Sequence, residues 1–132
     1  MTTIQNTTEI NRSVDEAFAF LTDLNNHEQL MPENIYNWSS TADEARFTIQ
    51  NMAKLALKVE ERVANELIKL IPSEKAPFEV TLRWELQAVS DTVTKATFVI
   101  DADLNMMMKM IATGPLQKLI DFQVNKLKAV LG

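Results

Sequence analysis

The chain has 132 residues, of which 46% are hydrophobic, and a formal net charge of −5. This composition excludes intrinsic disorder, and the negative charge argues against nucleic-acid binding, which needs a basic surface to neutralise phosphates. The absence of cysteine excludes thiol catalysis, cysteine metal sites and disulfides, and fits the reducing cytoplasm. Because no signal peptide and no apolar run long enough to span a membrane is visible, we expect a single cytoplasmic domain, residues 1–132.

The first predicted element is a strand over residues 3–10. Alternation places Ile4 and Ile10 on one face of it, together with Asn6 and Thr8. Two polar residues on an inward face have two explanations. Either the strand lies at a sheet edge and its polar side chains are satisfied locally, or they line the polar end of a cavity.

Two short helices are expected next. Ser13 is a helix cap, with Glu16 placed three residues later to complete a capping box. A second helix is predicted over residues 26–30, ending before Pro32 because the residue that precedes proline disfavours helix. The apolar stripe of this helical corner consists of Val14, Phe18, Leu21 and Leu24.

Six strands in three hairpins should follow. The chain has only two glycines, Gly114 and Gly132, so the hairpin turns must use Asn, Asp and Ser. We place these turns at residues 41–43, at Asn65 and at residues 90–91. The predicted strands are residues 35–40, 44–50, 55–64, 66–71, 78–89 and 92–104.

The last element is a helix over residues 105–131, kinked or broken at Gly114-Pro115. Its buried stripe is predicted to hold Leu116, Leu119, Ile120, Leu127 and Val130. Its start is crowded by Met106, Met107, Met108 and Met110, and unbranched methionine side chains adapt to irregular shapes. These methionines could fill the core or form a deformable wall for a ligand.

The helical corner carries a family resemblance. Residues 13–23 (SVDEAFAFLTD) followed by residues 25–32 (NNHEQLMP) resemble the START-like or SRPBCC superfamily, nearest to its polyketide cyclase/dehydrase and lipid-transport group. The resemblance implies an α+β helix-grip fold, in which a seven-stranded antiparallel sheet wraps around a long C-terminal helix, with two short helices after the first strand. It also implies an apolar cavity between sheet and helix. The chain departs from many members at residues 41–43, where they carry a glycine-rich loop.

Few residues suggest catalysis. His27 is the only histidine, and without a visible partner it reads as a surface residue rather than a base. No cluster has the spacing of metal ligands, so we expect neither a metal nor a cofactor. Glu61 is the carboxylate of interest: strict alternation with Leu57 and Val59 would turn it inward, where it could act as an acid or anchor a ligand. A bulge at Glu60-Glu61 would instead turn it outward.

Three functions follow. The first is binding or transport of a small hydrophobic ligand, such as a lipid or an aromatic, polyketide-like compound, between the sheet and the C-terminal helix. The second is a polyketide cyclase/dehydrase-type enzyme that uses the same cavity, and the third is a protein-interaction module with a filled core. The residues expected to line the cavity are Trp38, Ile49, Met52, Leu57, Val59, Glu61, Trp84, Leu86, Phe98, Met107, Met110 and Ile111.

Overall fold

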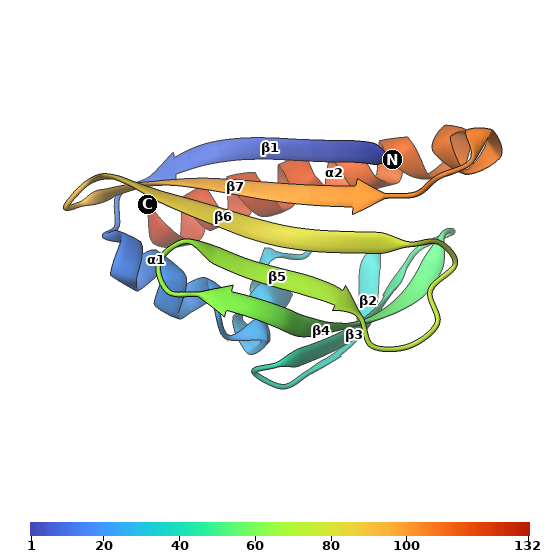
Figure 1. Ribbon diagram of the computed structural model, residues 1–132, viewed down its shortest axis with the longest axis horizontal. Coiled ribbons are helices and arrows are strands. Elements are labelled where there is room, and N and C mark those ends of the chain that lie inside the picture. The colour runs from blue at the N-terminus through green and yellow to red at the C-terminus, as the bar shows by residue number, and fades with distance from the viewer.

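A computed structural model, which describes all of residues 1–132, shows one antiparallel sheet gripping a long helix (Figure 1). The seven strands lie in the order β1-β7-β6-β5-β4-β3-β2, so each strand pairs with its neighbour in the chain except β1, which joins β7. The predicted α+β helix-grip fold is therefore confirmed. The elements are β1 (Thr2–Ile10), α1 (Val14–Leu21), the 3-10 helix η1 (Leu24–Leu30), β2 (Ile35–Ser40), β3 (Glu44–Ile49), β4 (Ala53–Val63), β5 (Leu67–Pro72), β6 (Val80–Ser90), β7 (Val93–Ala102) and α2 (Met106–Leu131).

The helical corner forms as its caps predict. The Ser13 hydroxyl accepts a hydrogen bond from the Glu16 backbone N–H at 3.2 Å and starts α1. Asp23 caps η1 in the same way, by accepting from the Asn25 N–H at 3.0 Å. The corner is fastened to β4 by Arg62, whose guanidinium donates to the Thr22 hydroxyl and to the Thr22 carbonyl.

Asparagines make the tight backbone turns, as the shortage of glycine requires. Asn51 and Asn65 adopt left-handed φ angles of 61° and 64° in the turns on either side of β4. Asn37 has a φ of 56° inside β2, where the pairing with β3 shifts register. This bulge interrupts the alternation of a regular strand, so that Ile35 and Trp38 both point inward while Tyr36 is exposed.

A second register shift settles the orientation of Glu61. The pairing of β4 with β5 is irregular between Val59 and Glu61, and the Glu61 side chain is exposed. The bulge alternative is thus confirmed, and an inward-facing Glu61 is wrong. The extra residue turns the charged stretch that follows it toward solvent, which avoids burying an unpaired carboxylate.

Asn6 of β1 has the first of the two explanations, an edge strand whose polar side chain is satisfied. β1 lies at the edge of the sheet, and α2 packs on it and on β7. The Asn6 amide donates to the Asp121 carboxylate of α2 at 3.0 Å, and Asp121 also accepts from Gln117 at 2.9 Å. Asn6 is therefore satisfied by the helix rather than left facing a cavity.

α2 is helical throughout, including at Pro115, so the alternative in which a second helix begins there is wrong. Proline has no N–H to donate to the Ile111 carbonyl, and this costs one helical hydrogen bond. The first turns of α2 project beyond the end of β7 (Figure 1). No helix in the structure is both long enough and apolar enough to cross a membrane.

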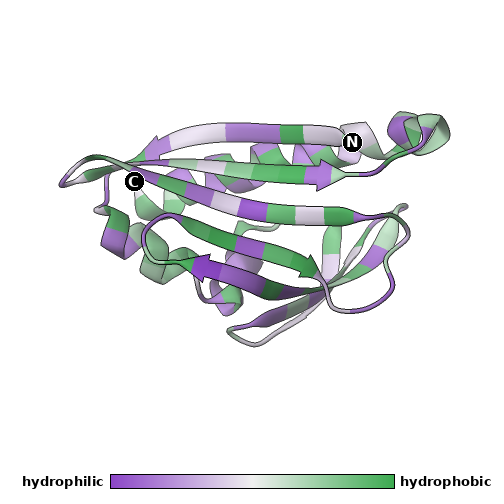
Figure 2. Cartoon of the chain, viewed as in Figure 1, coloured by the Kyte–Doolittle hydropathy of each residue, from purple (hydrophilic) through white to green (hydrophobic).

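The core lies between the inner face of the sheet and α2. Hydrophobic and hydrophilic residues alternate along the strands (Figure 2), so that each strand gives one face to the core. The opposite face is polar and carries ion pairs. Arg83 binds Glu85 of its own strand at 2.9 Å and also pairs across to Asp101 of β7. A hydrogen bond from Thr3 and the pairing with Arg83 lower the pKa of Asp101, against the opposing effect of partial burial.

Candidate ligand cavity between the sheet and the C-terminal helix

One small cavity lies at the centre of the core. Its volume is about 20 Å³, close to the space of a single water molecule. It is enclosed by η1 on one side, by the strands β2 to β7 below, and by α2 above. Ten of its twelve lining residues are apolar, and the full set is Leu24, His27, Met31, Trp38, Ala45, Phe47, Leu57, Leu70, Leu82, Phe98, Leu119 and Gln123.

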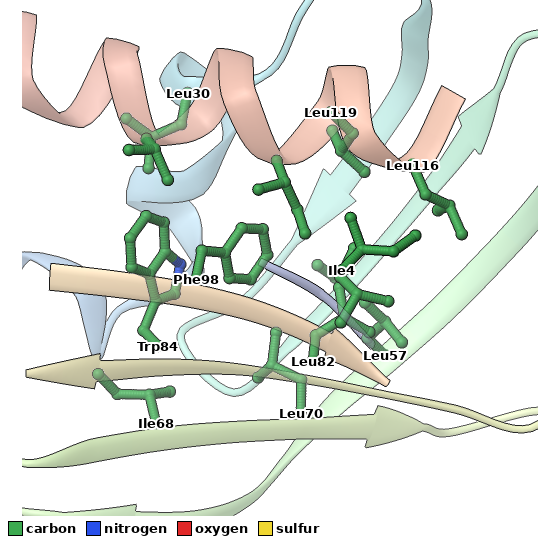
Figure 3. Close-up of a cluster of buried hydrophobic side chains, with 14 of the residues drawn as sticks. Ile4, Leu30, Leu57, Ile68, Leu70, Leu82, Trp84, Phe98, Leu116 and Leu119 are labelled. Carbon is green, nitrogen blue, oxygen red and sulfur yellow. The ribbon is translucent and has the colours of Figure 1, made fainter. Parts of the chain in front are cut away.

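Eight of the twelve expected site residues belong to the interior. Trp38, Leu57 and Phe98 line the cavity itself. Figure 3 shows Phe98 and Trp84 side by side beneath α2, and their rings stack at 4.6 Å between centroids. Ile49, Trp84 and Leu86 are buried core residues outside the lining, and Met52 and Val59 are partly buried against the same core.

The other four lie on the surface. Glu61 is turned outward by its bulge, and Met107, Met110 and Ile111 are 70%, 84% and 52% exposed on the projecting start of α2. No strand lies over these turns to cover them (Figure 1). Together with Met106, the three α2 residues form an apolar surface cluster that we call the methionine turn. Only Met108 of this region packs against the core.

His27 is buried, in contrast to the surface position predicted for it. It is 4% exposed, because residues spaced by three share a face of a 3-10 helix and Leu24 and Leu30 pack on that face. Its Nε2 lies 2.7 Å from the Leu21 carbonyl oxygen. Burial lowers the pKa of His27, more than the hydrogen bond to Leu21 and the charge of Asp23 raise it. The ring is therefore neutral at pH 7.

Gln123 is the second polar group of the cavity. It is 2% exposed on α2, and its Nε2 donates to the Met31 sulfur at 3.5 Å. Its Oε1 has no hydrogen-bond partner, and neither has the indole N–H of Trp84, which lies under Phe98. Unpaired polar atoms are rare in protein cores and mark a site of strain, of water or of function.

An open groove runs along α2, between that helix and two loops: the segment before β2, at Asn34, and the β3–β4 turn. Its volume is about 800 Å³, and its walls are mostly polar. Ile111 borders it from the methionine turn, Asn51 from the β3–β4 turn and Asp121 from the middle of α2.

Sequence reasoning missed nine lining residues, including both polar ones. Two signals could have found the polar pair. His27 sits at the centre of a period-three pattern with Leu24 and Leu30, and Gln123 occupies the apolar stripe of α2 between Ile120 and Leu127. A polar residue on an apolar stripe is the pattern of a buried polar group.

Comparisons with known proteins agree on the fold. No family model matches the chain, and no curated protein matches it. Among solved structures, it resembles a START superfamily protein from Mycobacterium smegmatis, with a TM-score of 0.68 and 15% identity over 97% of this chain and 98% of that one. It also resembles the Aha1 dimer from Colwellia psychrerythraea, with a TM-score of 0.71 and 18% identity over 99% and 96%.

A third similar structure is the di-domain ARO/CYC BexL from the BE-7585A biosynthetic pathway. The TM-score is 0.74 at 13% identity, and the match covers 98% of this chain but 46% of that protein. The chain therefore corresponds to about half of BexL. At these identities, the three likenesses establish a shared fold.

Proposed function

We propose that this chain, which has the START-like helix-grip fold that its sequence resembles, binds a small hydrophobic molecule between the sheet and α2. The observation that carries the proposal is the central cavity, apolar apart from His27 and Gln123. A core that served only for stability would gain by replacing Gln123, whose Oε1 is buried without a partner. An apolar pocket with a few polar groups is the usual composition of a ligand site.

Binding requires the core to open. A cavity of about 20 Å³ is far below the roughly 300 Å³ or more that a drug-sized ligand occupies. The arrangement of α2 favours one direction of opening, because the helix packs on β1, β7 and η1, while the groove separates it from Asn34 and from the β3–β4 turn. A ligand that separated α2 from the sheet would bury its own apolar surface against both. This burial contributes about 25 cal/mol of binding free energy per Å², before the costs of association.

The cyclase-type alternative has less support. Glu61, the acid suggested for it, lies outside the cavity, and no carboxylate is among the lining residues. His27 is the one titratable group there, and it is neutral and engaged with Leu21. Binding therefore accounts for the site better than proton transfer by a carboxylic acid does.

The test is a titration with N-phenyl-1-naphthylamine, a neutral apolar dye whose fluorescence rises in dry surroundings. The wild-type chain should bind it saturably. Ala45→Leu places extra carbon in the cavity and should weaken binding at least tenfold. The matched control Ala56→Leu, in the partner strand of the β3–β4 pair but outside the lining, should bind as wild type does. Absence of saturable binding, or equal weakening by both variants, would refute the proposal.

A second function, as a protein-interaction module, is favoured by the methionine turn. Its Met106, Met107 and Met110 side chains are 83%, 70% and 84% exposed, and such apolar clusters on a surface mark contact sites. A photo-crosslinking residue at Met107 should capture a partner in the host cell, and the same residue at exposed Tyr36 should not. Equal capture at both positions, or none, would argue against this function.

A further inference from the structure

The protonation of His27 follows from its one hydrogen bond. Its Nε2 lies 2.7 Å from the Leu21 carbonyl oxygen, and a carbonyl can only accept, so the hydrogen must be on Nε2. In a neutral ring the other nitrogen, Nδ1, then carries a lone pair. No protein group donates to it. His27, which lines the cavity, thus carries a free hydrogen-bond acceptor at Nδ1.

Gln123, on α2, brings the same kind of atom to the lining. Its amide nitrogen is engaged by the Met31 sulfur at 3.5 Å, which leaves Oε1 as the unpartnered atom. The two polar residues come from η1 and α2, on different sides of one cavity. The polar part of the lining therefore offers two acceptors, beside the one N–H of Gln123 Nε2 that the Met31 sulfur does not engage.

From this pairing we propose that the site selects an apolar molecule that carries a hydroxyl group, an alcohol or a phenol, over the corresponding ether or carboxylate. The inference rests on the proposed function and names its ligand class. A hydroxyl can donate to Gln123 Oε1 or to His27 Nδ1. An ether cannot donate, and an ionised carboxylate would place its charge against two lone pairs without a counter-charge.

The size of the cavity agrees with a hydroxyl as the first group to be seated. The space of about 20 Å³ fits one oxygen with its hydrogen, while the apolar remainder of the ligand displaces neighbouring side chains. Met31, unbranched and only partly buried, is the most easily moved of them.

The experiment compares three naphthalenes of nearly equal size by isothermal titration: 1-naphthol, 1-methoxynaphthalene and 1-naphthoate. The wild-type chain should prefer 1-naphthol over the methoxy compound by about tenfold, the equivalent of one hydrogen bond. Gln123→Leu should reduce that ratio at least threefold. The matched control Gln87→Leu, exposed on β6, should leave it unchanged.

A spectroscopic measurement reads the His27 contact directly. His27 is the only histidine, so its two ring nitrogens give unambiguous ¹⁵N signals, and 1-naphthol should shift the Nδ1 signal more than the Nε2 signal. If all three compounds bind equally and Nδ1 does not respond, the hydroxyl preference is wrong while hydrophobic binding stands. If none binds in either measurement, the proposed function itself fails.

Discussion

Replacing Gln123 by methionine should stabilise the ligand-free protein. Methionine keeps the length and the unbranched shape of glutamine, so the core needs little repacking. The change removes an unpartnered Oε1, whose burial costs about 1–3 kcal/mol. It also removes the contact of Nε2 with the Met31 sulfur, a weak acceptor at 3.5 Å. We expect a net gain of about 1 kcal/mol, which for a domain of this length raises Tm by roughly 4 °C.

Urea denaturation followed by tryptophan fluorescence, together with calorimetry, measures this gain. Gln87→Met is the matched control, because Gln87 is exposed and its replacement should change the free energy of unfolding by less than about 0.5 kcal/mol. A loss of 1 kcal/mol or more in Gln123→Met would refute the reasoning, since it would mean that a buried water satisfies the amide. Substitutions at Gln123 should therefore both raise the free energy of unfolding and reduce the selectivity for a hydroxyl group. Such opposite effects are expected at a residue that is kept for function at a cost in stability.

Three further predictions concern other parts of the chain. Arg62→Lys keeps the charge but loses the two hydrogen bonds to Thr22, and should lower the free energy of unfolding by about 1–3 kcal/mol in urea titrations. An unchanged urea midpoint would show that the helical corner is held by its apolar contacts alone. Burial lowers the pKa of His27 in the folded state, so the unfolded ring takes its proton first as the pH falls. Stability should be full above about pH 6.5 and decline below it by up to about 1.4 kcal/mol per pH unit, and His27→Gln should abolish this slope between pH 6.5 and 5.5. Met107→Ser, on the exposed turn, should change stability by less than about 0.5 kcal/mol, whereas Met108→Ser should cost more than 1 kcal/mol because Met108 packs on the core; the reverse order would contradict the placement of α2.

The elements were predictable because the signals that define them are local. Alternation marked the strands, Ser13 marked the start of α1, and the shortage of glycine pointed to asparagine turns such as Asn65. The side-chain orientations around Asn37 were not predictable. A bulge inserts one extra residue, so the residues that follow it in the strand point to the opposite face from the one that alternation gives.

The cavity was predictable in position but not in detail. Leu57 and Phe98 follow from strand alternation, and both line the cavity; Trp38 also lines it, but its orientation depends on the β2 bulge. The methionine turn was misplaced because helical spacing gives the face that a residue occupies but not whether the sheet extends far enough to cover it. The burial of His27 depends on η1 being a 3-10 helix, in which every third residue lies on the same face. The prediction of a surface histidine considered only the polar neighbours of His27 and not this spacing.

The position of β1 also governs how the chain can fold. β1 pairs only with β7, so Thr2 meets Ala102, and the residues after β1 are joined to the last helix through hydrogen bonds from Asn11 to Gly132 and from Arg12 to Leu131. During synthesis the first strand must wait for nearly the whole chain before it finds a partner. Contacts so distant in sequence slow folding, and they leave an unpaired strand open to aggregation in the meantime. The alternating polar residues of β1, among them Asn6 and Thr8, reduce that hazard while the strand waits.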